Sequence, residues 1–442
     1  MEDGENWGIH RVSKLVSEYE SLLGKGENPS FSAEDFMDIA EYYLRAYKYS
    51  EANEALRIAD RRYPDNIDIK IMQAYSLKDE GRWDLALKVI NNLPKSCDNR
   101  DARMFNIEYM LSLFSLDEAE EQFGEIIRET ASEEAGELYL SFAEMLFNYG
   151  YANRAEYWIN HYHPSEMGGF AEADSQRKQY YELRADICYQ LHHYDEAIDF
   201  ANKLIDIDPY DDISWTQLAE IYTAKQDYPN AMDSVEYAIS INPKSPKSLR
   251  QKLLILTAID LEPNLQIVSN TYAEYRKYYD DDYYVHIAVG NYFARYGRHN
   301  DSLGCYRLAL HKCPSQGVER VEVFRKIASA YANMEHYNEA LEAMLSSMGP
   351  GDRVVEFYIQ IAECCRIKGN HHSCSDILLG FLKEYKPTQD DIKTIMSYYY
   401  KYAVYEGAEA TWRELRNIYK KDDSDFDKIL DYATHRLSLD KS

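Results

Sequence analysis

A small residue recurs along this chain at an interval of roughly 34 residues, flanked each time by bulky apolar residues at helical spacing. In residues 212–245 the first half of the repeated unit places Trp215, Leu218, Ala219 and Tyr222 on one face of a helix. The second half repeats the pattern and ends before a proline, with the key places held by Ala231, Val235, Ala238 and Pro243. Small residues let two antiparallel helices approach closely, and proline cannot continue a helical hydrogen-bond ladder. The unit therefore predicts a helix-turn-helix hairpin.

The same register extends over most of the chain. Moving back by one such interval places Tyr181, Ala185, Ala197 and Pro209 at the positions of Trp215, Ala219, Ala231 and Pro243. A further full copy near the start contains Phe36, Ile39, Ala40, Tyr43, Ala52, Leu56, Ala59 and Pro64. The small residue of the first helix, called here the ladder residue, can be followed through Ala40, Ala74, Ile107, Ala143, Ala185, Ala219, Leu253, Gly290, Ala328, Ala362 and Met396. This ladder predicts about eleven hairpins; those at Ile107, Leu253 and Met396 depart from the small-residue pattern.

These residues resemble the tetratricopeptide repeat family, which has an aromatic residue, Leu, a small residue and Tyr in the first helix, then Ala, a second small residue and Pro. The resemblance implies an all-α fold, a right-handed superhelical α-solenoid of about eleven hairpins with terminal capping helices. We expect a capping helix and linker in residues 1–32 and a first group of repeats in 33–162. A joint loop in 163–177 would precede a second group of repeats in 178–421 and a capping helix and tail in 422–442.

Charge and composition narrow the classes of partner. The chain has 49 Lys and Arg against 76 Asp and Glu, a formal net charge of −27, which repels a phosphate backbone. The first residues, MEDGENWGIHRVSKLV, are acidic where a secretory signal is basic, and the most apolar run, residues 253–259, is too short to span a bilayer. Seven cysteines without a C-x-x-C pair are typical of free thiols. We expect a cytoplasmic protein that binds neither nucleic acid nor membrane.

The sequence contains none of the motifs that indicate a phosphate loop, a nucleophile elbow, an H-E-x-x-H zinc site or a dinucleotide fold. We therefore expect no enzyme activity, cofactor or metal. One group of soft ligands, Cys364, Cys365, His371, His372 and Cys374, leaves zinc binding open. The hairpin register favours another interpretation, in which Cys365 takes the aromatic place of Tyr222, Cys374 takes a small-residue place and the histidines lie in the turn. The pairs His161 with His163, and His192 with His193, are interpreted as solvated turn residues.

In the family that this chain resembles, first helices line the concave groove. The corresponding places hold Glu41, Glu182, Asp186, Tyr189 and Glu220 in the N-terminal and middle hairpins, and Arg295, Arg325, Arg366, Lys393 and Tyr400 in the C-terminal ones. This charge division predicts a partner segment lying with its basic part toward the acids and an acidic part or carboxylate toward the bases. A merely solvated face with uneven charge is an equal alternative.

The resulting hypothesis is a non-enzymatic scaffold or adaptor that binds protein or peptide segments in its groove. Tyrosine would supply contact area with a polar tip. Two other classes stay open: an RNA-processing helical-repeat protein, which the net charge disfavours, and a metal-responsive regulatory repeat protein.

Overall fold

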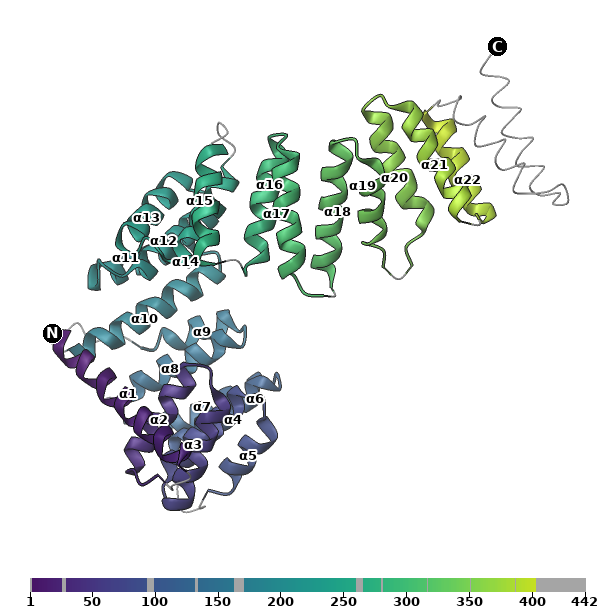
Figure 1. Cartoon of the computed structure of the whole chain (residues 1–442). Helices are drawn as coiled ribbons and strands as arrows, with labels where there is room; N and C mark the ends of the chain where they lie inside the picture. The colour runs from purple at the N-terminus through teal and green to yellow at the C-terminus, as the bar shows by residue number, and fades with distance from the viewer. Residues whose placement is uncertain are drawn as a thin grey trace, which may run out of the picture. The chain divides into compact units, whose positions relative to one another are not determined.

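The computed structural model describes residues 2–25, 29–93, 99–131, 134–162, 171–259, 265–279, 281–315, 317–349, 351–385 and 387–402, without the side chains of residues 2–10, 171–174, 389 and 400. These residues form 22 α-helices and no β-strand, which confirms the predicted all-α fold (Figure 1). The chain divides into two compact units, Met1–Ala197 (unit 1) and Ile198–Ser442 (unit 2).

Unit 1 is a stack of helical hairpins that follows one preceding helix. Its helices are α1 (Glu2–Gly24), α2 (Ala33–Arg45), α3 (Tyr49–Arg62), α4 (Ile67–Asp79), α5 (Trp83–Asn91), α6 (Arg100–Ser112), α7 (Leu116–Glu129), α8 (Ala135–Asn148), α9 (Ala152–Ile159) and α10 (Ala171–Gln190), and it includes the first residues of α11 (Tyr194–Ile207). In α1, Val16 and Tyr19 are buried against Phe36 and Tyr43 of α2, so the helix covers the open end of the first hairpin.

Unit 2 repeats this arrangement. Its helices are the rest of α11, then α12 (Asp212–Ala224), α13 (Tyr228–Ile241), α14 (Pro246–Ala258), α15 (Leu265–Tyr278), α16 (Tyr283–Arg295), α17 (His299–Lys312), α18 (Val318–Asn333), α19 (Tyr337–Leu345), α20 (Val354–Ile367), α21 (His371–Glu384) and α22 (Gln389–Tyr402). Each consecutive pair from α12 to α21 forms one hairpin, and α22 begins the next. None of the described helices combines the length and apolar character needed to cross a membrane.

Several first helices begin at side chains that cap them. Ser32 accepts a hydrogen bond from the Asp35 backbone N–H (3.1 Å), and Asp35 accepts one from the Ser32 backbone N–H (3.4 Å), forming a capping box at α2. Asn66, Asn99 and Asp211 accept bonds from the first backbone N–H groups of α4, α6 and α12. These polar residues satisfy donors that a helix start leaves unpaired, so they fix where each hairpin begins.

The turns between the two helices of a hairpin require a left-handed backbone. Glycine meets this need at Gly81 (φ 81°) and Gly150 (φ 84°), whereas Tyr47 and Phe114 adopt φ angles of 57° and 62° at the same kind of turn. A bulky residue in this region costs on the order of 1 kcal/mol. Tyr47 and Phe114 are 79% and 85% exposed, so the packing of the two helices that flank each turn must offset this cost, and not contacts of these side chains.

In the structure, every ladder residue lies on the first helix of a hairpin, from Ala40 on α2 to Met396 on α22. All are buried except Met396, which is half-buried. The larger Ile107 and Leu253 are fully buried, so those two hairpins accommodate a bulkier ladder residue at the helix contact.

One predicted boundary needs correction. Residues 171–177 were expected in a joint loop, but they form the first two turns of α10. The helix continues there because residues 171–181, AEADSQRKQYY, contain neither Gly nor Pro and are rich in good helix formers. The predicted capping helix in 422–442 and the end of the last repeat lie outside the described residues.

The close helix contact at Gly290 predicts a specific loss of stability. A Cβ atom added at Gly290 would lie 2.5 Å from Tyr306 Cε1 and 3.2 Å from Cys305 Cβ. Because both partners are buried in α17, Gly290→Ala should lower the free energy of unfolding by about 1–3 kcal/mol. Urea unfolding followed by circular dichroism measures this.

The control is Gly304→Ala on the same α17, where an added Cβ meets nothing within 4 Å. That variant should be neutral or more stable by up to about 1 kcal/mol, since Ala favours helix. Equal unfolding curves for the two variants would show that the Gly290 contact does not limit the packing.

Candidate partner-binding face

The first helices of successive hairpins pack against each other within each unit. In unit 1, α2 contacts α4, α4 contacts α6, and α8 contacts α10; in unit 2, contacts join α12, α14 and α16, and also α18, α20 and α22. In most hairpins the second helix packs on its own first helix and on the first helix that follows. The layer of first helices is thus closely spaced, and its outward side chains form a surface that we call the first-helix face.

Polar contacts join neighbouring first helices directly. Thr216 Oγ1 of α12 lies 2.8 Å from Ser248 Oγ of α14, and Gln251 Nε2 of α14 donates to Thr223 Oγ1 of α12 at 2.8 Å. Thr216 and Ser248 are buried, so this pair belongs to the helix contact. Such bonds hold the backbone of the face in a fixed arrangement before any partner arrives.

In unit 1 the residues that directly follow the ladder residues are mostly acidic. They are Glu41 on α2, Tyr75 on α4, Glu108 on α6, Glu144 on α8 and Asp186 on α10. Because they share one register position, they form a row along the first-helix face, called here the acidic row. The sequence analysis named Glu41 and Asp186 and missed Glu108 and Glu144, although the same position after Ile107 and Ala143 identifies them.

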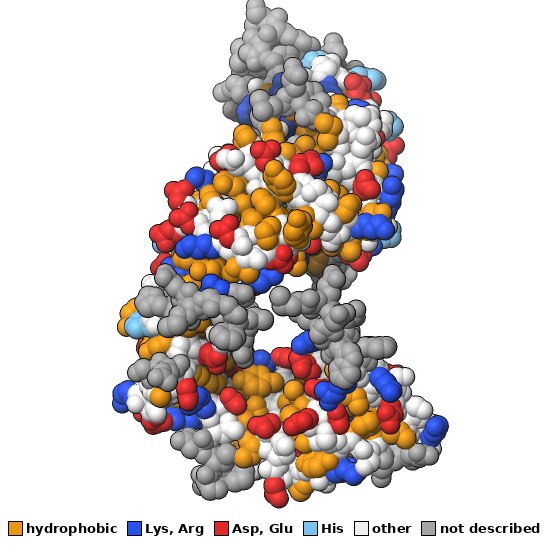
Figure 2. All heavy atoms as spheres, turned by 90° about the vertical axis from the view of Figure 1, so that its left-hand side faces the viewer, with side chains coloured by type: hydrophobic (Ala, Val, Ile, Leu, Met, Phe, Trp, Pro, Cys, Tyr) orange, Lys and Arg blue, Asp and Glu red, His pale blue; other side chains and the backbone are white. Residues whose placement is uncertain are grey.

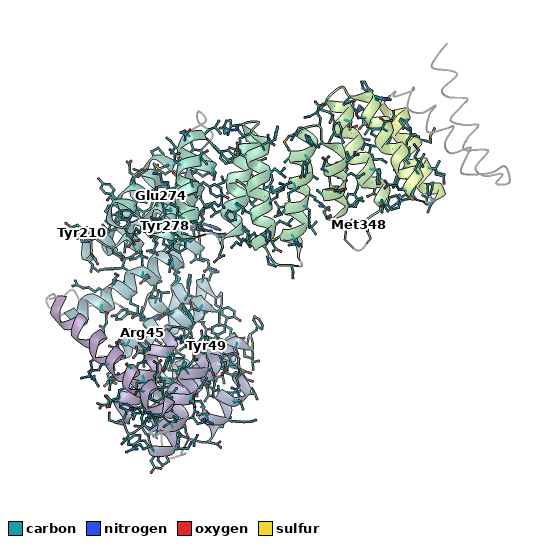
Figure 3. All side chains as sticks on the ribbon, viewed as in Figure 1. Arg45, Tyr49, Tyr210, Glu274, Tyr278 and Met348 are labelled. Carbon is teal, nitrogen blue, oxygen red and sulfur yellow. The ribbon has the colours of Figure 1, made fainter. Side chains whose placement is uncertain are left out.

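Three of these carboxylates form an ion pair or a hydrogen bond with a neighbouring side chain. Glu41 Oε1 pairs with Arg45, the last residue of α2, at 2.5 Å, and Arg45 is labelled in Figure 3. Glu144 Oε2 accepts a hydrogen bond from Gln179 Nε2 of α10 at 3.1 Å. Glu108 Oε1 pairs with Lys78 Nζ of α4 at 2.9 Å. Only the Glu108 pair is shielded from water, because its two side chains are 12% and 17% exposed.

The Glu108 carboxylate also affects the tyrosines beside it. Tyr149 donates to Glu108 Oε1 at 3.5 Å, and Lys78 Nζ lies 4.9 Å from the centre of the Tyr75 ring. Burial first, and then the negative charge of Glu108, raise the pKa of Tyr75 above its usual range. The tyrosine hydroxyls therefore stay neutral, and the Lys78 charge is shared between a carboxylate and an aromatic ring.

The predicted residues of α10 fall together at one end of the acidic row. Glu182 and Tyr189 are exposed and Asp186 is half-buried, which matches the expected spacing on one helix face. Tyr189 is 40% exposed, and its ring centre lies 6.2 Å from that of Tyr194. This group combines two carboxylates with an accessible aromatic ring.

In unit 2 the predicted basic residues share their charge with nearby carboxylates. Arg366 Nε and Nη2 donate to the two Glu363 oxygens at 2.8 and 2.6 Å, and the guanidinium lies 4.1 Å from the centre of the Tyr402 ring. The hydrogen bond from Arg366 lowers the pKa of Glu363 against the effect of its burial. Lys393 Nζ lies 3.4 Å from Asp390 Oδ1.

The other predicted residues of unit 2 differ in exposure. Arg295 and Arg325 are exposed at the C-terminal end of α16 and in the middle of α18, and Glu220 is half-buried on α12. The side chain of Tyr400 lies outside the described ones. Unit 2 thus presents mixed charge on its first-helix face, in contrast to the acidic row of unit 1.

Exposed tyrosines of unit 2 lie both near connections between hairpins and on a second helix. Tyr210 is 80% exposed between α11 and α12, and Tyr278, 41% exposed, ends α15 (Figure 3). Tyr237 of α13 stacks on Trp215, with ring centres 4.9 Å apart. Of the tyrosines predicted for the groove, only Tyr189 has a described side chain on the first-helix face.

The cysteine and histidine group of α20 and α21 does not converge. Cys365 and Cys374 are fully buried in the core, where Cys374 Sγ lies 3.4 Å from the Tyr398 hydroxyl. His371 and His372 are exposed, and His372 Nε2 lies 3.7 Å from Asp376. The thiols therefore act as small core residues, as the hairpin register predicted, while the imidazoles point to solvent.

The repeated hairpins and their shared first-helix face define a helical repeat protein. A sequence model of the tetratricopeptide repeat matches residues 178–211 and 213–245, which cover the hairpins of α10 with α11 and of α12 with α13. The chain therefore contains tetratricopeptide repeats in residues 178–245. The matched segments are the two copies whose register the ladder places one repeat interval apart.

Solved structures with repeats of this kind are similar to parts of the chain at low identity. A MamA protein structure is 14% identical, covers 44% of this chain and 96% of its own, and has a TM-score of 0.35. The structure of YrrB, titled a TPR protein with an unusual peptide-binding site, is 16% identical, covers 46% of this chain and 98% of its own, and has a TM-score of 0.34. The P58(IPK) TPR domain is 17% identical, covers 88% of this chain and 99% of its own, and has a TM-score of 0.23. A comparison with curated proteins found no match. The family assignment therefore rests on the repeat model and the hairpins.

The shielded ion pair predicts an unequal response to losing a cation. Lys78→Met leaves Glu108 charged in a poorly solvated place and should cost about 2–4 kcal/mol of unfolding free energy. Arg45→Met removes the partner of Glu41, where the two side chains are 79% and 48% exposed, and should cost less than about 0.5 kcal/mol. Urea unfolding of both variants tests the difference.

Adding Glu108→Gln to Lys78→Met removes the unpaired charge, so the double variant should recover part of the loss. A double variant no more stable than Lys78→Met alone would contradict the electrostatic explanation.

Buried thiols predict a loss of stability at alkaline pH. Burial, and then the neighbouring thiols Cys374 and Cys364, raise the pKa of Cys365 from its usual 9.0 to about 12. The unfolded chain releases this proton near pH 9 while the folded chain retains it. The stability is thus fully present below pH 9 and is lost as the pH rises toward about 12.

The measurement is urea unfolding at several values between pH 8 and pH 11. Other buried groups, including Tyr306 with a pKa raised to about 12 by burial, contribute to the same trend. Cys365→Ala should therefore show a shallower decline than the unchanged chain, relative to its own value at pH 8. Parallel declines would show that Cys365 does not titrate in this way.

Proposed function

We propose that this repeat protein is a non-enzymatic scaffold and that the first-helix face of unit 1 binds a basic, partly apolar segment of a partner protein. The observation that carries the proposal is the acidic row, in which four of five successive hairpins present a carboxylate at one register position. A partner lying along the row would meet the carboxylates of Glu41, Glu144 and Asp186, while Glu108 lies shielded beside Lys78.

The helices around the acidic row are also negatively charged. Residues 100–148, from the start of α6 to the end of α8, contain 12 Asp and Glu against three Lys and Arg, and six of these acids lie on the second helix α7. The lower part of Figure 2 shows one side of unit 1, where acidic side chains stand among hydrophobic ones. Charge of one sign steers an oppositely charged partner and orients it, while the apolar contacts add affinity.

The carboxylates lie on rigid helices, and some are already oriented by neighbours such as Gln179, which donates to Glu144. Pre-oriented groups lose little conformational freedom when a ligand binds. Tyr189 at the α10 end offers an exposed aromatic ring for an apolar or cationic side chain of the partner.

For unit 2 we propose a separate surface of mixed charge. Arg295 and Arg325 are exposed there and could receive a carboxylate of a partner. Arg366 and Lys393 share their charge with Glu363 and Asp390. An RNA-processing role is not favoured, since the acidic row repels phosphate groups.

The proposal predicts binding that depends on charge and salt. Three fluorescent peptides with the same length and apolar residues would carry Lys, Ser or Glu at their polar positions. The Lys peptide should bind most tightly by fluorescence anisotropy and weaken as salt is raised, because exposed charges are screened. Glu182→Lys with Asp186→Lys should weaken its binding by about tenfold.

The matched control is Glu118→Lys with Glu121→Lys, which makes the same change of net charge at exposed residues of the second helix α7. This control should bind the Lys peptide nearly as well as the unchanged chain. Equal weakening in both double variants would mean that net charge alone attracts the peptide, and equal binding of all three peptides would refute the proposal.

A further inference from the structure

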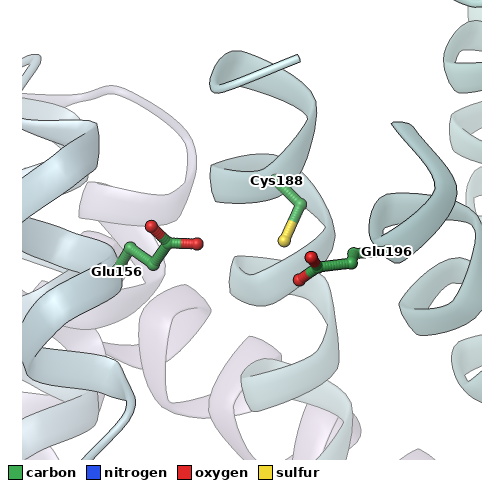
Figure 4. Close-up of side chains that lie close together, drawn as sticks. All are labelled: Glu156, Cys188 and Glu196. Carbon is green, nitrogen blue, oxygen red and sulfur yellow. The ribbon is translucent and has the colours of Figure 1, made fainter. Parts of the chain in front are cut away.

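Three metal-ligating side chains from three helices meet within unit 1, away from the acidic row. Glu156 of α9, Cys188 of α10 and Glu196 of α11 each bring one ligand atom to within 4.8 Å of the other two. Figure 4 shows the two carboxylates on either side of the Cys188 sulfur, which points into the space between them. Two carboxylates and a thiol at this distance offer a divalent cation three ligands.

The sulfur at the base of this group is a second, separate observation. Cys188 is fully buried. It stands one repeat interval before Tyr222, in the place where the repeat has an aromatic ring. A short thiol at an aromatic place points its sulfur toward the carboxylates.

A fourth ligand lies at the mouth of the group. His193 Nδ1 is 3.7 Å from Glu156 Oε1, and the His193 side chain is 49% exposed. The sequence Cys188-x4-His193-x2-Glu196 runs from the last turn of α10 to the first turn of α11. The partly exposed His193 ring thus lies beside Glu156 and can supply a fourth ligand.

We propose that Glu156, Cys188, His193 and Glu196 form a binding site for a zinc-like divalent cation. Zinc takes four ligands in a tetrahedron and accepts sulfur, imidazole nitrogen and carboxylate oxygen. Bonds of roughly 2.0–2.3 Å require the ligand atoms of Glu156, Cys188 and Glu196 to draw together by about 1 Å, and His193 to turn toward them from beside Glu156. The mixed ligand set excludes calcium and magnesium as preferred ions, since both select oxygen.

Such a site would join α9 to α10 and to the start of α11. Binding the cation only in the folded chain would stabilise this part of unit 1 by mass action. The proposal is independent of the acidic row, because none of the four residues belongs to it.

The test uses the full chain, stripped with a chelator and titrated with Co²⁺. A thiolate bound to cobalt gives a charge-transfer absorption in the near ultraviolet, and Zn²⁺ should displace it at one equivalent. Cys188→Ala should abolish this band, while Glu156→Gln, Glu196→Gln and His193→Ala should each weaken binding by at least about tenfold. Circular dichroism of each variant checks that the chain is folded.

Two controls separate this site from the other soft ligands. Cys364→Ala, and His371→Ala with His372→Ala, should leave the band and the Co²⁺ affinity unchanged. Absence of the band in the unchanged chain, or its persistence in folded Cys188→Ala, would overturn the proposal. Unchanged affinity in both Glu variants would show binding by the thiol alone, and unchanged affinity in His193→Ala would overturn the four-residue assignment.

Discussion

The structure depends on the close approach of two antiparallel helices at the ladder residue of each hairpin. At Gly290 the helix contact leaves no space for a single additional carbon beside Tyr306. At Ala40, Ala143 and Ala219 the same place is fully buried. Because each hairpin can bury only part of its apolar surface, the close contact also fixes the plane in which the next hairpin stacks. The first-helix face is a consequence of this stacking, since its spacing follows from that of the ladder.

The acidic row shows how a surface property arises from a packing register. Each of its residues directly follows a ladder residue, so the constant spacing of the ladder gives the row its own constant spacing. Glu108 differs from the other acids of the row in its exposure. Its carboxylate is largely shielded, and Lys78 from the preceding first helix compensates its charge. The other acids of the row remain closer to solvent, where a partner can reach them.

The cysteines show that one repeat position can have different chemistry in different hairpins. Cys188 and Cys365 both take the place of the aromatic residue, and both are fully buried. Cys365 is enclosed by the apolar core of α20 and α21. Cys188 instead points toward two carboxylates that come from α9 and α11. The difference lies in the neighbouring helices and not in the position itself.

The sequence by itself determined the helices, the hairpin register and the identity of the repeat, because these follow from local spacing of small, bulky and helix-breaking residues. It also placed Cys365 and Cys374 in the core and Glu182, Asp186 and Tyr189 on one helix face. Only the tertiary structure decided which charges are shared, as with Arg366 and Glu363, and which distant ligands meet, as with Glu156 and Cys188. These contacts depend on side-chain directions across helices, which a repeat period along one chain does not specify.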